Sequence, residues 1–537
     1  MLLHVAFVCL LSLPNALATE ISLPNRNYKF DTNGNLIDAH DGKMYFFEDK
    51  YYFYGTSYNC GFRWRTSNYT SPFCGFKAYS STDLLVWEDE GFLFDASTHY
   101  WQTACADTAA CFRPKVLNPR PGEYIMWMNS GASNWSYTVF NSSKPAGPYT
   151  EIGQPVMPYE RGNSSYGNGD FGIHIGPDGD VLLLGYIIYD TTPHVTGPPL
   201  FSSPNITYGV IQKLTPDYKA TEPSYVVTDL TNIEAWDIWY RDGWWYITFG
   251  HICGYCDATD TSYVKLKDPL TPNMAEERIR ITNSSCGGQH NMVAQLPKGS
   301  SSGNSSADDY VYLYGSDLWT GDVNEGKAGS HWEPLRFLPD GSIEPLNCYS
   351  PQYTIDIRAA QSQAVDLFSN ATVTSAPGNY TWSCGFGIHN HNFIWQFFQA
   401  PKSGTVTEFG VNIAQQANDA PAEIYLGEVY GNASDLFSSQ GGVKNLYAAS
   451  LPIDTIGWAL PMITARPNVT VEAGQYYAIY MTTTGGAIPY CYLYHETGYN
   501  NDNVFQPPTS FMSEIQMGRY PLFPLLNQEM RYYVQID

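Results

Sequence analysis

Charged residues are scarce in this chain of 537 residues, and basic residues are the scarcest of them. Asp, Glu, Lys and Arg make up 15% of the sequence, and 28 basic residues against 52 acidic ones give a formal net charge of −24. Such a charge opposes contact with nucleic acid or an anionic membrane, so we exclude both as partners. After residue 18 no apolar run reaches the roughly 20 residues of a membrane-spanning helix. We expect a soluble monomer.

Residues 1–18, MLLHVAFVCLLSLPNALA, have the pattern of a secretory signal, with an apolar segment and a small-residue cleavage site at its end. Removing them leaves ten of the 11 cysteines, an even number that suits disulfides in an oxidising compartment. The chain also has 11 Asn-X-Ser/Thr sequons. We therefore expect an extracellular, secreted glycoprotein. Proximity in sequence suggests the pairs Cys60–Cys74, Cys105–Cys111, Cys253–Cys256, Cys286–Cys348 and Cys384–Cys491.

One pattern recurs five times: a turn rich in Gly or Asp precedes a short apolar and aromatic strand. The copies are DKYYFYG (49–55), GEYIMWM (122–128), GDVLLLG (179–185), GWWYITF (243–249) and DDYVYLYG (308–315). Their spacing, and the absence of a convincing long amphipathic helix, predict an all-β five-bladed β-propeller over residues 19–348. The alternative is a large irregular β-sandwich.

The repeat spacing is lost after Cys348, although strand-like runs such as FIWQFFQA (393–400) and AEIYLGEVYG (422–431) continue. Hairpin-type turns separate these runs, which predicts a C-terminal β-sandwich over residues 349–537. Three roles stay open for it: a sugar-binding module, a lid that shapes the pocket, or a structural buttress.

Acidic residues stand at the heads of three repeats: Asp41, Asp170 and Glu234. A propeller gathers the first strand of each blade around one channel, so these acids are expected to meet there. Glu234 lies between Ile233 and Ala235, where poor solvation would raise its pKa and suit a proton donor. For each acid the alternative is an ordinary residue of a turn or strand end.

The order and spacing of these motifs resemble glycoside hydrolase family 43 over roughly residues 35–346. His40-Asp41 resembles the family's opening motif, and Ile233-Glu234-Ala235 resembles the motif of its general acid. Further similarities are SSTDLLVW (80–87), AGPY (146–149) and WEPLRF (332–337). The resemblance implies an inverting mechanism with Asp41 as general base, Glu234 as general acid and Asp170 as the residue that orients the acid and raises its pKa.

Within the family the chain is most similar to fungal exo-β-1,3-galactanases, through Arg113-Pro114-Lys115-Val116 followed by GEYIMWM. It departs from them at Phe112, where they tend to have glutamate, and it has both Asp41 and Gln289 where they tend to have only the glutamine. Gln289-His290-Asn291 resembles a motif of family arabinanases whose histidine faces a metal ion. The mechanism requires no cofactor, but the resemblance makes His290 a candidate ligand for a central Ca²⁺.

Sugars stack their apolar faces on aromatic rings, so aromatic residues near the acids are candidates for substrate binding. Trp236, beside the acid, is the first of them, and Trp135, Trp319 and Phe112 follow. Arg113 and Gln289 complete the expected substrate-binding set.

We expect a secreted glycosidase that acts on a plant-type polysaccharide or oligosaccharide, with β-1,3-galactan as the first substrate. An α-L-arabinofuranosidase or a β-xylosidase of the same family is the alternative. Other classes are a catalytically inactive sugar-binding propeller and a structural surface glycoprotein.

Overall fold

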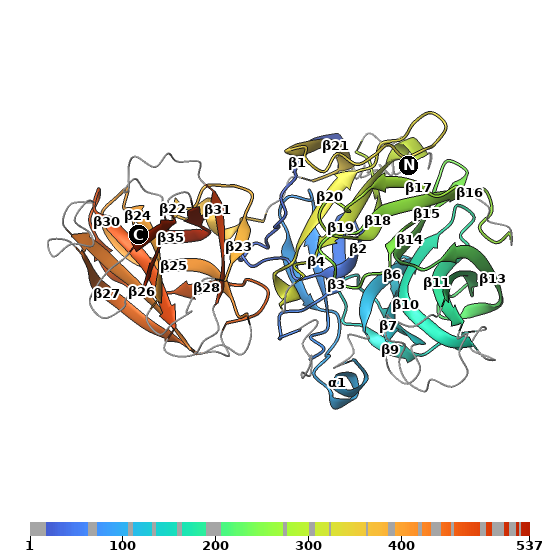
Figure 1. Ribbon diagram of the computed structural model, residues 1–537, viewed down its shortest axis with the longest axis horizontal. Helices are drawn as coiled ribbons and strands as arrows, with labels where there is room; N and C mark the ends of the chain where they lie inside the picture. Colours follow the sequence, from blue (N-terminus) through green and yellow to red (C-terminus); the bar gives the residue numbers. More distant parts are fainter. Residues whose placement is uncertain are drawn as a thin grey trace, which may run out of the picture.

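The computed structural model describes residues 18–62, 72–105, 111–130, 136–157, 164–189, 206–271, 277–299, 307–321, 324–360, 364–384, 392–416, 421–430, 442–452, 456–483, 490–496, 510–514, 522–525 and 528–537. They form two lobes, coloured blue to yellow and orange to red in Figure 1. Strands dominate both lobes, so the all-β class is confirmed. The described helices are short: α1 (His99–Cys105), α2 (Leu367–Asn370), and the 3₁₀ turns η1 (Ala307–Asp309) and η2 (Glu325–Lys327). None of these helices is long and apolar enough to cross a membrane.

The first lobe contains five consecutive antiparallel sheets, in each of which the strands pair in chain order. The first comprises β2 (His40–Phe47), β3 (Lys50–Thr56), β4 (Phe76–Ser81) and β5 (Glu88–Phe92), and the second β6 (Phe112–Arg120), β7 (Glu123–Ser130), β8 (Ser136–Ser142) and β9 (Thr150–Gly153). The third comprises β10 (Ser164–Ile175), β11 (Val181–Tyr189), β12 (Ile206–Leu214) and β13 (Thr221–Thr231). The fourth comprises β14 (Ile233–Arg241), β15 (Trp244–His251), β16 (Thr261–Leu266) and β17 (Ile279–Thr282), and the fifth β18 (Gln289–Pro297), β19 (Tyr310–Leu318) and β20 (Gly329–Pro334).

The first strands of the five sheets, β2, β6, β10, β14 and β18, contact one another in a closed ring. A separate hydrophobic cluster fills the space between each pair of neighbouring sheets, including the fifth and the first. Burial of these apolar faces holds the sheets together around a common axis. The arrangement is therefore of the propeller type.

A strand beyond residue 348 also belongs to the first lobe. Strand β21 (Gln352–Arg358) pairs with β1 (Ala18–Pro24), and Ile355 and Ile357 share a hydrophobic cluster with the first and fifth sheets. The expected domain boundary at residue 348 is therefore wrong, because the chain leaves this core only after Ala359. The signal sequence expected at 1–18 lies almost wholly outside the described residues.

Tight turns between the first and second strands follow from local sequence. In the fourth sheet Arg241 pairs with Trp244, and the two residues between them, Asp242 and Gly243, have φ of 52° and 78°. Two positive φ values define a type I′ turn, which Asp-Gly favours and whose twist matches that of the strands. This is the Gly- or Asp-rich turn expected before the strand in GWWYITF (243–249).

Each of the five first strands carries an irregular register near its head. The shifts lie between residues 40 and 43, 112 and 115, 167 and 172, 234 and 237, and 290 and 292. Three of them contain a non-glycine residue with positive φ: Asp41 (53°), Arg113 (59°) and Ala235 (55°). In the first, second, fourth and fifth sheets the shift inserts one extra residue, and such a β-bulge re-aims the side chains beside it at one end of the ring.

Below the bulges a buried ion pair occupies the axis. The Lys43 ammonium lies 2.7 Å from both carboxylate oxygens of Asp237, and the two side chains are 3% and 0% exposed. Burial alone would raise the pKa of Asp237, but Lys43 and Lys115 hold it below its usual value. Asp237 also accepts a hydrogen bond from the amide of Val293 at 2.8 Å, which ties the fourth sheet to the fifth.

The second lobe contains two antiparallel sheets. One has the path β22 (Val373–Thr374), β35 (Tyr532–Ile536), β25 (Gly404–Ala414), β31 (Cys491–Glu496) and β23 (Thr381–Ser383), with β28 (Met462–Ala465), β29 (Val469–Val471) and β34 (Gln528–Met530) beside it. The other comprises β27 (Gly442–Leu451), β26 (Ala422–Tyr430), β30 (Tyr476–Thr483), β24 (Asn392–Gln399), β32 (Ser510–Glu514) and β33 (Leu522–Leu525). Apolar residues of both sheets share one hydrophobic cluster, which is the core of this lobe.

The disulfides match the pairs expected from sequence: Cys60–Cys74, Cys105–Cys111, Cys253–Cys256, Cys286–Cys348 and Cys384–Cys491.

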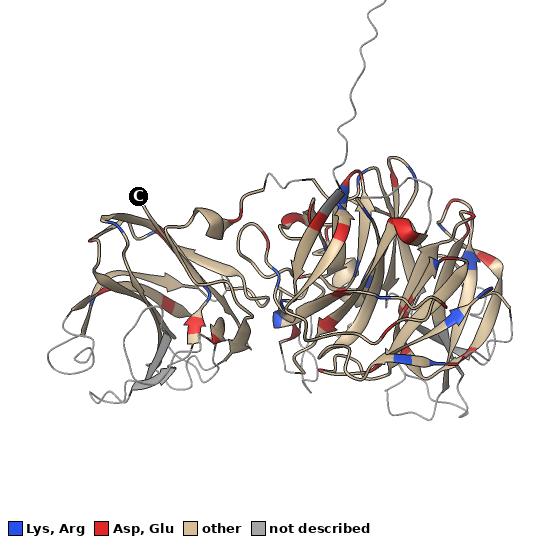
Figure 2. Cartoon of the chain, turned by 90° about the horizontal axis from the view of Figure 1, so that it is seen from above, with Lys and Arg blue, Asp and Glu red and all other residues tan. Residues whose placement is uncertain are grey.

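Acidic and basic residues are interspersed on both lobes (Figure 2).

Replacing Lys43 by Met should lower the free energy of unfolding by about 3–5 kcal/mol, because it leaves the Asp237 carboxylate buried without its main counter-ion. Urea unfolding followed by tryptophan fluorescence would measure the loss. The matched control is the double variant Lys43→Met/Asp237→Asn, which removes the stranded charge but keeps an acceptor for Val293. It should recover most of the loss, and equal destabilisation of both variants would contradict the assignment.

Candidate active site

One buried guanidinium joins two of the expected acids. Arg113 lies 2.7 Å from Asp170 Oδ1 through Nε, 3.2 Å from Asp170 Oδ2 through Nη2, and 3.3 Å from Asp41 Oδ1. Arg113 is 1% exposed, and its bulge directs it along the ring towards both neighbours. Burial lowers the pKa of Arg113, but the charges of Asp170 and Asp41 outweigh burial and raise it, so the side chain is a permanent cation.

The third acid is connected to this pair through its own backbone. Asp170 Oδ2 accepts a 2.6 Å hydrogen bond from the amide of Ala235, the residue that follows Glu234. Asp170 is held in turn by the bidentate contact with Arg113. Residues 41, 170 and 234, which belong to three different sheets, therefore meet at one end of the ring.

Glu234 receives three hydrogen bonds on a single oxygen. Its Oε1 accepts from the amides of Cys253 and Gly254, at 2.6 and 2.8 Å, and from Gln289 Nε2 at 2.6 Å. Among the described residues no donor contacts Oε2. This asymmetry makes Oε2 the atom that can carry a transferable proton.

The electrostatic environment brings the pKa of Glu234 close to neutral pH. Burial raises its pKa to about 7, the negative charge of Asp170 adds to this effect, and the two backbone hydrogen bonds oppose it. Burial also raises the pKa of Asp41, and the cation of Arg113 works against that rise. Burial thus raises the pKa of both carboxyl groups, and Arg113 is the largest influence against the rise at Asp41.

Aromatic residues and Gln289 connect Glu234 to Asp41 through a series of contacts. Gln289 Oε1 accepts from Trp319 Nε1 at 2.9 Å, and the Trp319 ring stacks against Tyr58 with centroids 6.0 Å apart. The Tyr58 hydroxyl donates to Asp41 Oδ2 at 3.2 Å and also contacts the Tyr255 hydroxyl at 3.0 Å.

Several of these residues were missed from sequence. Tyr58 and Tyr255 lie in loops, and no strand pattern predicts where a loop side chain ends. Asp317, which accepts from the amide of Asp41 at 2.7 Å, stands at the far end of β19 rather than at the head of a repeat. The sequence motif His40-Asp41 assigns no role to His40. In the structure its ring stacks on Tyr58 with centroids 4.7 Å apart.

The remaining substrate-binding predictions have different outcomes. Trp236 is wrong: its ring is fully buried in the hydrophobic cluster between the third and fourth sheets, where no sugar can reach it. Trp319 lies at the site, but it is 3% exposed and enclosed by other rings, so it supports Gln289 rather than offering an open face. Phe112 is half-buried beside Arg113. Trp135 lies outside the described residues.

The surroundings of His290 do not fit a central Ca²⁺. Its Nε2 lies 2.8 Å from Thr248 Oγ1, its ring stacks on Tyr314, and burial lowers its pKa to about 3. The negative charge of Asp237 opposes this fall in pKa, and the nearby Arg113 and Lys115 add to it. Calcium takes about 6–8 oxygen ligands and favours carboxylates. The carboxylate facing this region, Asp237, is already paired with Lys43.

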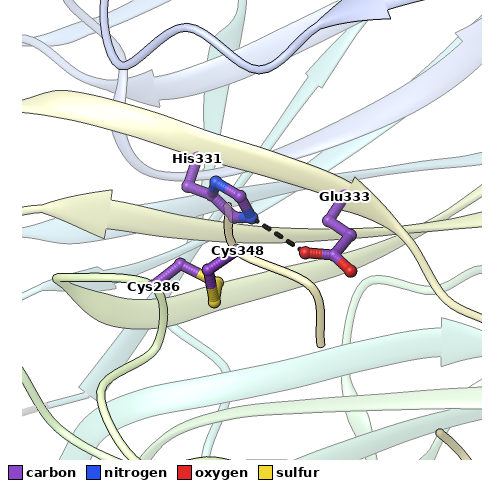
Figure 3. A group of neighbouring side chains, drawn as sticks. All are labelled: Cys286, His331, Glu333 and Cys348. Carbon is purple, nitrogen blue, oxygen red and sulfur yellow. Dashed lines mark hydrogen bonds and ion pairs between the residues drawn. A yellow bond between two sulfur atoms is a disulfide. The ribbon is translucent and has the colours of Figure 1, made fainter. Parts of the chain in front are cut away.

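One other group of metal-ligating residue types lies among the described residues: Cys286, His331, Glu333 and Cys348 (Figure 3). The two sulfurs are joined in a disulfide and are not thiolate ligands. Glu333 already contacts His331 at 3.3 Å and accepts from Tyr353 and from the amide of Asn347. The group is a structural network.

No family model matches the chain, and neither does any curated protein. Solved structures do. One described as a glycoside hydrolase is 13% identical, with a TM-score of 0.51 over 87% of this chain and 98% of its own. An exo-β-1,3-galactanase from Phanerochaete chrysosporium with galactose is 17% identical, with a TM-score of 0.47 over 88% of this chain and 100% of its own. An exo-β-1,3-galactanase from Clostridium thermocellum is 17% identical, with a TM-score of 0.45 over 96% and 100%. The first similarity shows a shared fold.

We expect His290→Gln to leave any effect of Ca²⁺ on thermal unfolding unchanged, because the axis holds lysine and arginine where an ion would stand. Calorimetric unfolding temperatures of both forms, in millimolar Ca²⁺ and in EDTA, would test this. A stabilisation by Ca²⁺ that is present in the wild type and lost in His290→Gln would contradict it, since a bound ion stabilises by mass action.

Proposed function

We propose that the chain is a glycoside hydrolase of family 43 that cleaves a glycosidic bond by inversion. The observation that carries the proposal is the geometry of the three acids. Glu234 is buried with a raised pKa, Asp170 holds the peptide that follows it, and Asp41 lies across Arg113 from Asp170. The shared fold with a glycoside hydrolase structure supports this reading.

The proposed reaction begins with Glu234 protonated on Oε2. This proton passes to the glycosidic oxygen as the bond to the anomeric carbon breaks, and Glu234 becomes a carboxylate. Asp41 takes a proton from a water molecule as the water oxygen attacks the opposite face of that carbon. The three hydrogen bonds on Oε1 stabilise the carboxylate that forms on Glu234, so they favour proton release in the transition state.

The contacts of Gln289 favour Asp41 as the base. Gln289 donates to Glu234 and accepts from Trp319, so both ends of its amide are used on the acid's side of the site. Asp41 has one oxygen near Arg113 and the other near Tyr58. These contacts fix the direction of its carboxylate, as a base that orients water requires.

For the substrate we propose β-1,3-galactan cleaved from chain ends. This choice rests on the sequence resemblance around Arg113-Pro114-Lys115-Val116. An arabinofuranosyl or xylosyl substrate would use the same acids, and a catalytically inactive sugar-binding propeller would bind without releasing product. Chromatography of products from galactans, arabinans and xylans, beside calorimetric binding, separates these outcomes.

We further propose that the five sheets of the first lobe are the blades of a five-bladed propeller and that the second lobe is a β-sandwich. The ring of first strands and the shared core of the two C-terminal sheets support this assignment. We also propose secretion, which the five disulfides and the N-terminal sequence support.

Glu234→Gln should lower kcat by several orders of magnitude, because the amide cannot deliver a proton, while the unfolding temperature changes little. Hydrolysis of galacto-oligosaccharides would measure the loss. Glu529→Gln is the matched control: Glu529 is a buried glutamate of the second lobe whose pKa burial raises to about 8. The control should keep its activity, and a fully active Glu234→Gln would refute the assignment.

Activity should depend on pH with two limbs. It should fall above a pH of about 7, where Glu234 loses its proton, and fall on the acid side as Asp41, whose pKa burial raises, becomes protonated. Asp170→Asn removes a negative charge that raises the pKa of Glu234, so the upper limb should move to lower pH. The pH profile of kcat/KM for both forms measures this shift, and an unmoved limb would speak against the role of Asp170.

A further inference from the structure

A short segment of the second lobe, residues 456–460, reaches the side of the first lobe that carries the candidate site. We call it the brace segment. It lies between β27 and β28, and Ile456, Ala459 and Leu460 are no more than 3% exposed. Its contacts fall on two loops of the first lobe.

The first loop follows Tyr58. Asn59 Oδ1 accepts hydrogen bonds from the amides of Trp458 and Ala459, at 2.7 and 2.8 Å. The approach is close because a glycine stands opposite: a Cβ on Gly457 would lie 2.4 Å from this same oxygen. The indole of Trp458 covers Gly61, where a Cβ would lie 3.2 Å from the ring. The brace segment thus holds the residue next to the tyrosine that donates to Asp41.

The second loop follows Trp319. Asn324 Nδ2 donates to the carbonyl of Trp458 at 2.9 Å and to that of Gln415 at 2.6 Å. Its Oδ1 caps η2 by accepting from the amide of Gly326. Glu325, the first residue of η2, accepts from the amide and hydroxyl of Thr320, the neighbour of Trp319. This chain of contacts connects the second lobe to the tryptophan that donates to Gln289.

A cation anchors the same loop. Lys327, at the end of η2, donates to Gln416 Oε1 at 2.8 Å, and its ammonium lies 3.5 Å from the centre of the Trp382 ring. Trp382 and Gln416 both belong to the second lobe. The Lys327 side chain therefore anchors the loop after Trp319 to the second lobe.

We infer that the brace segment is a positioning element of the candidate active site. It fixes Tyr58 and Trp319, and through them the direction of the Asp41 carboxylate and of the Gln289 amide on Glu234. The second lobe acts here through first-lobe residues and without contact with the substrate. This inference rests on the proposed function and assigns the second lobe a role in the reaction.

A merely structural interface is the competing explanation, and the chain offers a control for it. Asn35 Oδ1 accepts from the amide of Met462 at 3.0 Å, a contact of the same chemistry across the same two lobes. The Asn35 side chain also donates to Asp31, and neither residue contacts Tyr58, Trp319 or the residues that these two contact in the site. Its loss should weaken the interface without moving Tyr58 or Trp319.

The test compares full-length Asn59→Ala, Asn59→Asp, Asn324→Asp and Asn35→Ala with the wild type. In Asn59→Ala the acceptor is lost, whereas Asn59→Asp keeps an oxygen for the two amides. Asn324→Asp keeps the cap of η2 but removes both donated bonds. We expect kcat to fall roughly 10- to 100-fold in Asn59→Ala and Asn324→Asp, as sub-ångström misplacement of catalytic groups does. KM should change little, Asn59→Asp should recover most of the rate, and Asn35→Ala should keep it.

Hydrogen exchange supplies a readout that does not need activity. Peptides that contain Tyr58 or Trp319 should exchange faster in Asn59→Ala and Asn324→Asp than in the wild type and in Asn35→Ala. Unchanged kcat and exchange, or an equal fall in Asn35→Ala, would overturn the inference. If the wild type cleaves no glycoside, the proposed function fails; exchange then still decides whether the brace segment holds the two loops.

Discussion

The candidate site depends on one cation placed among acids. Three carboxyl groups placed close together in a buried region would repel one another when ionised, and without a counter-charge their ionised forms would be strongly destabilised. Arg113 supplies that charge, with a planar fork that meets Asp170 through two nitrogens and Asp41 through one. It favours the ionised form of Asp41, and it also lowers the pKa of Glu234, which burial and Asp170 raise. This placement supports the proposed assignment of Asp41 as base and Glu234 as acid.

A second buried cation performs a structural task on the same axis. Lys43 neutralises Asp237, whose other contact joins the fourth sheet to the fifth. The first lobe thus uses lysine and arginine at the depth where the arabinanase-like motif around His290 led us to expect a metal. The sheets converge on charged groups there, and those groups compensate one another.

Sequence patterns predicted the all-β class, and proximity in sequence predicted the five disulfides. The meeting of Asp41, Asp170 and Glu234 could be predicted because repeats place equivalent positions on equivalent strands. The sequence-based prediction was wrong where a bulge breaks the two-residue alternation of side chains in a strand. Glu234 and Trp236 would share a face in a regular strand, but the bulge at Ala235 sends Trp236 into the core. Tyr58 and Tyr255 lie in loops, and residues 456–460 contact Asn59, about 400 positions away, and Asn324, 134 positions away. No local pattern encodes such contacts.

The bulges also bear on how such a site can change over evolutionary time. An extra residue at the head of a strand is tolerated there because the ladder resumes a few positions later, as it does at residues 43, 115 and 237. Gaining or losing a single codon at that point would redirect a side chain of the rim and leave the rest of the sheet undisturbed. A lineage could therefore change the chemistry of the rim on four separate strands without rebuilding the sheets.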